Sequence, residues 1–190
     1  MASSSPRSDR PRLTRRAIAL CVAIAAVAAV LSAVLVAGAG GDGTGATAGL
    51  QRTRRAPSMP FPRFDGSTAS FDGYRGEKLV VNFFSSTCLP CKREMPALQQ
   101  VHREVGEEVT FVGIDVQDTV EDGRQIVDQT GVTYDIGRDP SGTLFNRFGA
   151  TLLPTTAFVA ADGTILELHT GALTAAQLRD KIGATLLGGG

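Results

Sequence analysis

The sequence predicts an α/β domain with a central mixed β-sheet and helices on both faces, preceded by one N-terminal transmembrane helix. Apolar runs typical of strands alternate with helical patterns, which favours a parallel sheet core. The last two strand-like runs flank a short turn and therefore add an antiparallel hairpin, which makes the sheet mixed. A long uncharged apolar segment before the domain predicts the membrane helix.

Charge is unevenly distributed along the 190 residues, although the chain carries 19 basic and 19 acidic side chains in total. Residues 1–55 hold eight Arg against two Asp, a net charge of +6. Residues 56–190 hold eleven Lys and Arg against seventeen Asp and Glu, a net charge of −6. Because an acidic domain repels nucleic acid, we expect no nucleic-acid partner.

The N-terminal region predicts an anchor in the cytoplasmic membrane. Residues 17–37 carry no charge, and a helix of about 20 apolar residues crosses a hydrocarbon core of ~30 Å. Residues 1–16 are basic, so the positive-inside bias places the N-terminus in the cytoplasm and the later residues outside. The alternative is a signal peptide cleaved near Ala-Gly-Ala at 37–39, which would leave a secreted protein.

A linker and a single folded domain are predicted after the anchor. Residues 38–58 are rich in Gly, Ala and Thr and show no apolar period, which is typical of a flexible tether. We expect the domain to span residues 59–190 and to be monomeric.

The strands and helices of the domain follow from the period of the apolar residues. Strands are predicted at 78–84, 109–116, 155–160 and 164–170. A helix is predicted from Pro90 through Val105, where apolar residues recur at three- and four-residue steps. Further helices are predicted at 120–131, 140–149 and 174–187, the last capped by Thr174.

Cys88 and Cys91 form a C-x-x-C pair, whose spacing suits a metal site, a structural disulfide or redox exchange. A structural zinc site needs four ligands, and the two histidines of the chain, His102 and His169, are far apart in sequence. A disulfide that closes so small a loop removes little entropy from the unfolded chain. Redox exchange fits best, because Cys88 lies where a strand gives way to a helix, whose free N–H groups stabilise a thiolate.

Two stretches of the domain resemble a known family. The stretch "LVVNFFSSTCLPCKREMP" at 79–96 resembles the TlpA/ResA-like membrane-anchored thiol–disulfide oxidoreductases of the thioredoxin-like superfamily, in particular through Asn82, Pro90 and Pro96. The stretch "LLPTTAFVAADG" at 152–163 resembles the cis-proline loop of the same family. The resemblance covers about residues 60–187 and includes the family's N-terminal hairpin.

The resemblance implies a thioredoxin-like fold and a set of site residues. Leu153–Pro154 would be a cis peptide bond, with Pro154 against the disulfide and the Leu153 backbone free to pair with an extended substrate. Thr87, Leu89 and Pro90 would contact that substrate beside Cys88.

Two departures from the family pattern concern proton transfer and partner recognition. Thr87 stands where the family usually has Trp, and Asn82 cannot exchange a proton with Cys91 as the Asp of many thioredoxins does. Asp118 resembles the active-site acid of ResA-like proteins, whereas the residues alone are equally consistent with a solvated acidic loop. Glu94 is interpreted as a first-turn acid that favours the helix dipole.

The predicted function is extracytoplasmic reduction of disulfides in exported proteins such as apocytochrome c, with electrons from a membrane donor of the thiol-relay type. The Cys88–Cys91 disulfide needs no cofactor or metal. One alternative is an oxidase that donates its disulfide to secreted proteins. Another is a tethered, non-catalytic binding or chaperone module. A peroxiredoxin is disfavoured, because the Pro and Thr of the P-x-x-x-T-x-x-C pattern are absent.

Overall fold

The computed structural model describes residues 54–188, so the predicted anchor at 17–37 lies outside the described residues. Five strands form one sheet in the order β5–β4–β3–β6–β7. They are β3 (Leu79–Phe84), β4 (Thr110–Val116), β5 (Asp135–Asp139), β6 (Thr155–Val159) and β7 (Ile165–Thr170). The first three are parallel, while β6 and β7 are each antiparallel to their neighbour, which confirms the predicted mixed sheet.

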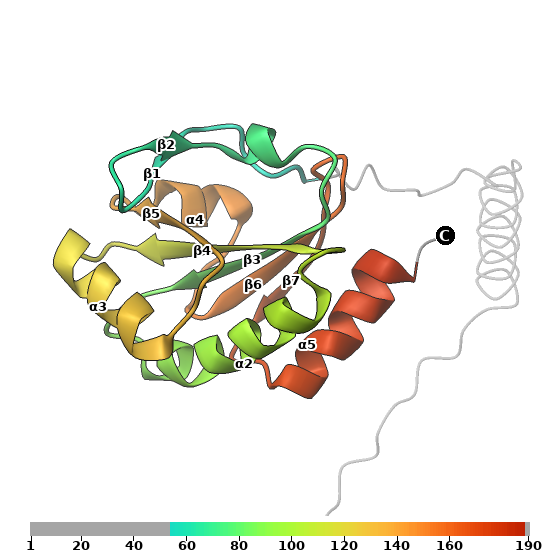
Figure 1. Ribbon diagram of the computed structural model, residues 1–190. Coiled ribbons are helices and arrows are strands. Elements are labelled where there is room, and N and C mark those ends of the chain that lie inside the picture. The colour runs from blue at the N-terminus through green and yellow to red at the C-terminus, as the bar shows by residue number, and fades with distance from the viewer. Residues whose placement is uncertain (1–53, 189–190) are drawn as a thin grey trace, which may run out of the picture. The chain divides into compact units, whose positions relative to one another are not determined.

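Helices cover both faces of this sheet (Figure 1). One face carries α2 (Leu89–Val105), α3 (Val120–Thr130) and α5 (Ala175–Ile182), which continues as a π-helical turn, η2 (Gly183–Leu187). The other face carries α4 (Thr143–Phe148), the hairpin of β1 (Phe61–Pro62) and β2 (Thr68–Ala69), and the 3-10 turn η1 (Phe71–Tyr74). Within residues 54–188, no helix has the length and apolar character to cross a membrane.

The central strand β3 supplies both cores of the domain. All six of its residues are buried, as expected for a strand with neighbours on both edges and helices on both faces. Since successive side chains point to opposite faces, Val80 and Phe84 pack in the core beneath α2, whereas Val81 and Phe83 pack in the core beneath α4.

The strand β5 is absent from the sequence prediction. Its segment, Asp-Ile-Gly-Arg-Asp, mixes charged residues with a glycine and has no apolar alternation. It becomes a strand because it pairs in parallel with β4 at the edge of the sheet. Tertiary pairing here overrides a weak local preference.

Side-chain caps fix the starts of two helices. Thr119 accepts a hydrogen bond from the Asp122 N–H at the start of α3. Thr174 and Gln177 form a reciprocal capping box at the start of α5, which confirms the predicted cap.

The folded domain begins earlier than the predicted residue 59. The Arg54 carbonyl accepts a hydrogen bond from Ile165 N, and Ala56 N donates to the Gly163 carbonyl. Ala56 is buried as well, at 4% exposure. The segment has no apolar period of its own and is ordered by its pairing with the β6–β7 hairpin.

Substitution of Gly123 by alanine is expected to change stability in an unusual direction. In a helix, Gly→Ala ordinarily stabilises a protein by about 1 kcal/mol. A Cβ on Gly123 in α3 would lie 2.3 Å from Asp115 Oδ2 and 2.7 Å from Phe64 Cζ, whereas one on Gly183 would meet no atom within 4 Å. We expect Gly123→Ala to destabilise by about 1–3 kcal/mol, the usual cost of overpacking.

Gly183→Ala is the matched control and is expected to raise the free energy of unfolding slightly. Denaturant unfolding of the oxidised protein measures both variants. A Gly123→Ala protein as stable as the Gly183→Ala protein would contradict the packing of Asp115 against α3.

Candidate active site

The cysteine pair lies at the junction of the central strand and the first long helix. β3 ends at Phe84, and Cys88 is the N-cap of α2. Cys88 and Cys91 are joined by a disulfide, and the Cys88 Sγ accepts a hydrogen bond of 3.2 Å from the Cys91 N–H. Backbone N–H groups of this kind, together with the helix dipole, favour a thiolate on Cys88 once the disulfide is reduced.

The two cysteine residues differ in accessibility. Cys88 is half-buried at the surface, whereas Cys91 is only 1% exposed. Pro90 lies in the first turn of α2, where its missing N–H costs no helical hydrogen bond. A partner molecule can therefore reach Cys88, while Cys91 can attack only a bond that Cys88 has already formed.

The loop before β6 supplies a second wall of the site. The Leu153–Pro154 peptide bond is cis, and Pro154 is buried. Leu153 packs against the same hydrophobic cluster as Cys88. Among residues 54–188, no backbone hydrogen bond of Leu153 is formed, while the Pro154 carbonyl accepts one from Gly171 N. The Leu153 backbone is free to pair with an extended segment.

Exposed apolar side chains are found both in the C-x-x-C motif and in the loop that carries the cis proline. Leu89, inside the C-x-x-C motif, and Leu152, two residues before the cis proline, are each 66% exposed. Thr87 is also exposed. Leu152 is an additional exposed residue of the site, and the run of two leucines before the proline is the sequence signal for it.

A buried polar trio, Asn82, Glu94 and Thr156, links β3, α2 and β6. Asn82 Nδ2 donates to Thr156 Oγ1 at 3.1 Å and more weakly to Glu94 Oε1 at 3.4 Å, and Thr156 Oγ1 donates to Glu94 Oε1 at 3.3 Å. Glu94 Oε2 has no hydrogen-bond partner among the described residues. Burial raises the pKa of Glu94 to about 7, and the hydrogen bond from Thr156 and a smaller interaction with the Leu173 backbone offset only part of this effect.

Glu94 is therefore not the first-turn acid that the sequence suggested. α2 begins at Leu89, so Glu94 lies in its second turn, and its side chain is only 2% exposed. It follows Cys91 by three residues and shares its helix face. The buried pattern of Cys91, Met95 and Leu98 was the signal that this face points inward.

Asp118 holds the loop that leads into Cys88. Its carboxylate accepts hydrogen bonds from the Ser86 N–H and, at 2.9 Å, from the Ser86 hydroxyl. The structure thus places Asp118 against the active-site loop and not in a solvated acidic loop. Pro96 lies inside α2 on its exposed side, away from the buried trio.

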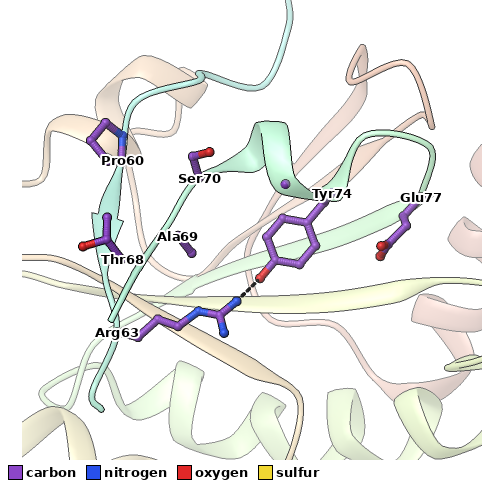
Figure 2. Close-up of a pocket in the computed structure, with 8 residues that line it drawn as sticks. Pro60, Arg63, Thr68, Ala69, Ser70, Tyr74 and Glu77 are labelled. Carbon is purple, nitrogen blue, oxygen red and sulfur yellow. Dashed lines mark hydrogen bonds between the residues drawn. The ribbon is translucent and has the colours of Figure 1, made fainter. Parts of the chain in front are cut away.

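A surface hollow beside η1 is separate from this chemistry. Figure 2 shows it lined by Arg63, Tyr74 and neighbouring residues of the N-terminal hairpin. Arg63 donates to the Tyr74 hydroxyl at 2.7 Å, and that hydroxyl donates to Asp135 at 2.7 Å. These groups tie the hairpin to β5. In the part of the chain that the structure describes, no cluster of three or more His, Cys, Asp or Glu side chains is arranged for a metal ion.

Comparison with known proteins places this site in a family. The model of the AhpC/TSA family matches residues 53–168. The thioredoxin-like protein YneN of Bacillus subtilis is 25% identical over 70% of this chain and 80% of its own length. The thiol-disulfide oxidoreductase ResA of Oceanobacillus iheyensis is 32% identical over 60% of each chain.

Solved structures show the same architecture. DsbF of M. tuberculosis superposes with a TM-score of 0.63 at 26% identity, covering 67% of this chain and 94% of its own. A secreted Mycobacterium tuberculosis disulfide oxidoreductase homologous to DsbE gives a TM-score of 0.61 at 25% identity, covering 67% and 96%. The fold is thus thioredoxin-like. The chain belongs to the AhpC/TSA family, and its cysteine pair and relatives are those of a TlpA/ResA-like thiol–disulfide oxidoreductase.

Proposed function

We propose that the protein reduces disulfides in exported polypeptides, apocytochrome c among them, through the Cys88–Cys91 dithiol. One observation carries the proposal: an accessible sulfur at a helix N-terminus is bonded to a buried sulfur that shares its helix face with a buried carboxyl. Attack needs an accessible thiolate, and resolution needs a second thiol that can lose its proton.

In the first step, the Cys88 thiolate attacks one sulfur of the substrate disulfide. The substrate S–S bond breaks, a mixed disulfide forms, and the other substrate sulfur leaves as a thiolate. An extended substrate segment pairs with the free backbone of Leu153, and its side chains contact Leu89, Pro90 and Thr87. With Thr87 in place of an aromatic residue, the exposed leucines supply most of the apolar contact.

In the second step, Cys91 resolves the mixed disulfide. Its thiol passes a proton to the ionised Glu94, and the resulting thiolate attacks Cys88 Sγ. The Cys88–Cys91 bond forms, and the second substrate sulfur leaves as a thiolate. The substrate has gained two electrons and the site has lost two. Since Glu94 has a pKa of about 7, it can both accept and return a proton near neutral pH.

The carboxyl groups around the pair favour the reductive direction. Glu94 is a buried residue of α2 three positions after Cys91, and Asp118 contacts the loop before Cys88. Negative charge there offsets part of the thiolate stabilisation that the helix N-terminus provides, whereas strong oxidants owe their potential to a stabilised reduced form. The Leu–Pro dipeptide between the cysteines also resembles that of reducing members.

We propose an extracytoplasmic location at the cytoplasmic membrane, with the N-terminal segment as the tether. The uncharged residues 17–37 and the basic residues before them support this topology. A membrane donor of the thiol-relay type would return two electrons to the Cys88–Cys91 disulfide after each cycle.

Cysteine variants test the enzyme itself. In an insulin-reduction assay we expect Cys88→Ser to lose all activity, because no accessible thiolate remains. Cys91→Ser should accumulate a mixed disulfide with insulin, because the resolving thiol is absent; non-reducing gel electrophoresis measures the adduct. Asp128→Asn, an exposed change on α3, is the control and should match wild type. Wild-type activity in Cys88→Ser would instead indicate a binding or chaperone module.

Glu94→Gln tests the buried carboxyl through the pH dependence of stability. The folded pKa of Glu94, about 7, exceeds its ordinary value of 4.5, so its proton stabilises the fold at low pH. That contribution is complete below pH 4.5 and is lost as pH rises toward 7, a loss on the order of 3 kcal/mol. We expect the oxidised wild type to lose more unfolding free energy between pH 5 and pH 8 than Glu94→Gln does.

Urea unfolding of both oxidised proteins at three pH values measures the difference, since disulfide-bonded cysteines do not titrate. Equal pH slopes in the two proteins would show that Glu94 is not held at a raised pKa.

A further inference from the structure

Asp115, near the end of β4, is a carboxyl group that the redox cycle does not use. Its side chain is fully buried, and neither carboxyl oxygen accepts a hydrogen bond from a described donor. The nearest cation is Arg138, whose Nε lies 3.8 Å from Oδ2, too far for a hydrogen bond. An ionised carboxylate in this environment is costly, because it has neither water nor hydrogen-bond donors.

The surroundings of Asp115 disfavour its negative charge further. The charged groups that face it are Asp118 from the loop after β4, Asp122 from α3 and Arg138 from β5. Two of the three are acidic. Gly123 of α3 and the Phe64 ring close the remaining space, because a Cβ on Gly123 would meet both Asp115 and Phe64.

Arg138 is directed to other partners. Its Nη2 donates to the Asp118 carbonyl at 3.0 Å, and its guanidinium lies over the Phe64 ring, 5.5 Å from the centroid. Its Nε, the atom nearest to Asp115, has no hydrogen-bond acceptor. The geometry is that of a cation that holds the loop backbone and not that of a hydrogen-bonded ion pair with Asp115.

The loop that carries Asp118 is held in a strained conformation. Gln117 has a φ of 60°, the left-handed region that non-glycine residues seldom adopt. Its N–H donates to the Asp139 carbonyl at 3.0 Å. This turn directs the Asp118 carboxylate toward Ser86, two residues before Cys88. Such strain persists only where neighbouring contacts enforce it.

We propose that Asp115 is a positioning residue of the dithiol site that acts as a neutral carboxylic acid. Its O–H donates to the Asp118 carboxylate, which in turn accepts the N–H and hydroxyl of Ser86 and so fixes the loop before Cys88. The hydrogen bond accounts for a buried oxygen that otherwise has no partner.

The acid–base properties of Asp115 agree with this role. Burial and the hydrogen-bonding Asp118 carboxyl raise the pKa of Asp115 to about 8, against a smaller opposing effect of Arg138. Asp115 therefore carries its proton at neutral pH. Above pH 8 it ionises, the hydrogen bond is lost, and two carboxylates face each other.

Asparagine and alanine distinguish a neutral Asp115 from an ionised one. Asparagine keeps the shape and offers an N–H donor to Asp118, so Asp115→Asn imitates the protonated acid. Asp115→Ala removes the donor. If Asp115 acted instead as an anion beside Arg138, both variants would be equally damaging.

The test uses the full chain in detergent, in its oxidised form, followed by NMR from pH 5 to pH 9.5. In wild type, the Asp115 carboxyl carbon should titrate at least two pH units above an ordinary Asp, and the Ser86 amide proton should shift with the same midpoint. In Asp115→Asn, the Ser86 amide proton should have the chemical shift that it has in wild type at neutral pH, and that shift should no longer change with pH. The control variant Asp128→Asn on α3 should retain the titration step of wild type.

Alkylation of the reduced protein at pH 7 measures the consequence for the thiol. We expect the Cys88 rate of Asp115→Ala to differ from wild type at least threefold and that of Asp115→Asn to stay within twofold. The proposal is overturned if the Asp115 carboxyl carbon shows no titration step between pH 6 and pH 9.5, if Asp115→Asn retains the Ser86 step, or if both variants alkylate alike. Its bearing on catalysis rests on the proposed function, but the NMR readout needs no turnover, so the two can fail separately.

Discussion

The site depends on a helix that begins at Cys88, and the hydrogen bond from the Cys91 N–H to the Cys88 sulfur is formed at this helix start. A parallel strand must end at Phe84 so that a helix can begin at Cys88, with one sulfur at the surface and the other one turn inside. β3 meets this requirement because it is buried on both faces and paired on both edges. The position of the disulfide is therefore set by the core of the sheet and not by the loop alone.

Two buried carboxyls close to the site in sequence and fold have raised pKa values. Glu94 lies on α2 three residues after Cys91, and Asp115 lies near the end of β4, three residues before Asp118. Burial is the largest cause of the shift in both, to a pKa of about 7 for Glu94 and about 8 for Asp115. We propose different roles for them: Glu94 exchanges a proton with the resolving thiol, whereas Asp115 keeps its proton and fixes the loop before Cys88. Both need a low-dielectric environment, which the packed helices α2 and α3 provide.

The sequence was sufficient for most of the fold, because β3, β4 and the helices have strong apolar periods. It was insufficient for β5, whose five residues become a strand only through pairing with β4. Glu94 was misread for a similar reason: its environment includes Thr156 from β6, which is 62 residues away in the chain. Motifs located the cysteines, and the spacing of Cys91, Met95 and Leu98 indicated the inward face of α2. The hydrogen-bond partners of a buried carboxyl come from distant parts of the chain, and periodicity does not report them.

The reduction potential of the Cys88–Cys91 pair tests most directly whether this arrangement makes a reductant. Equilibration of the full chain with defined thiol–disulfide buffers at pH 7 gives the value. Carboxyls that oppose a stable thiolate predict a potential near the ~−270 mV of thioredoxin. A value near the ~−120 mV of DsbA would mean that the site stabilises its reduced form, and it would contradict the reductive account.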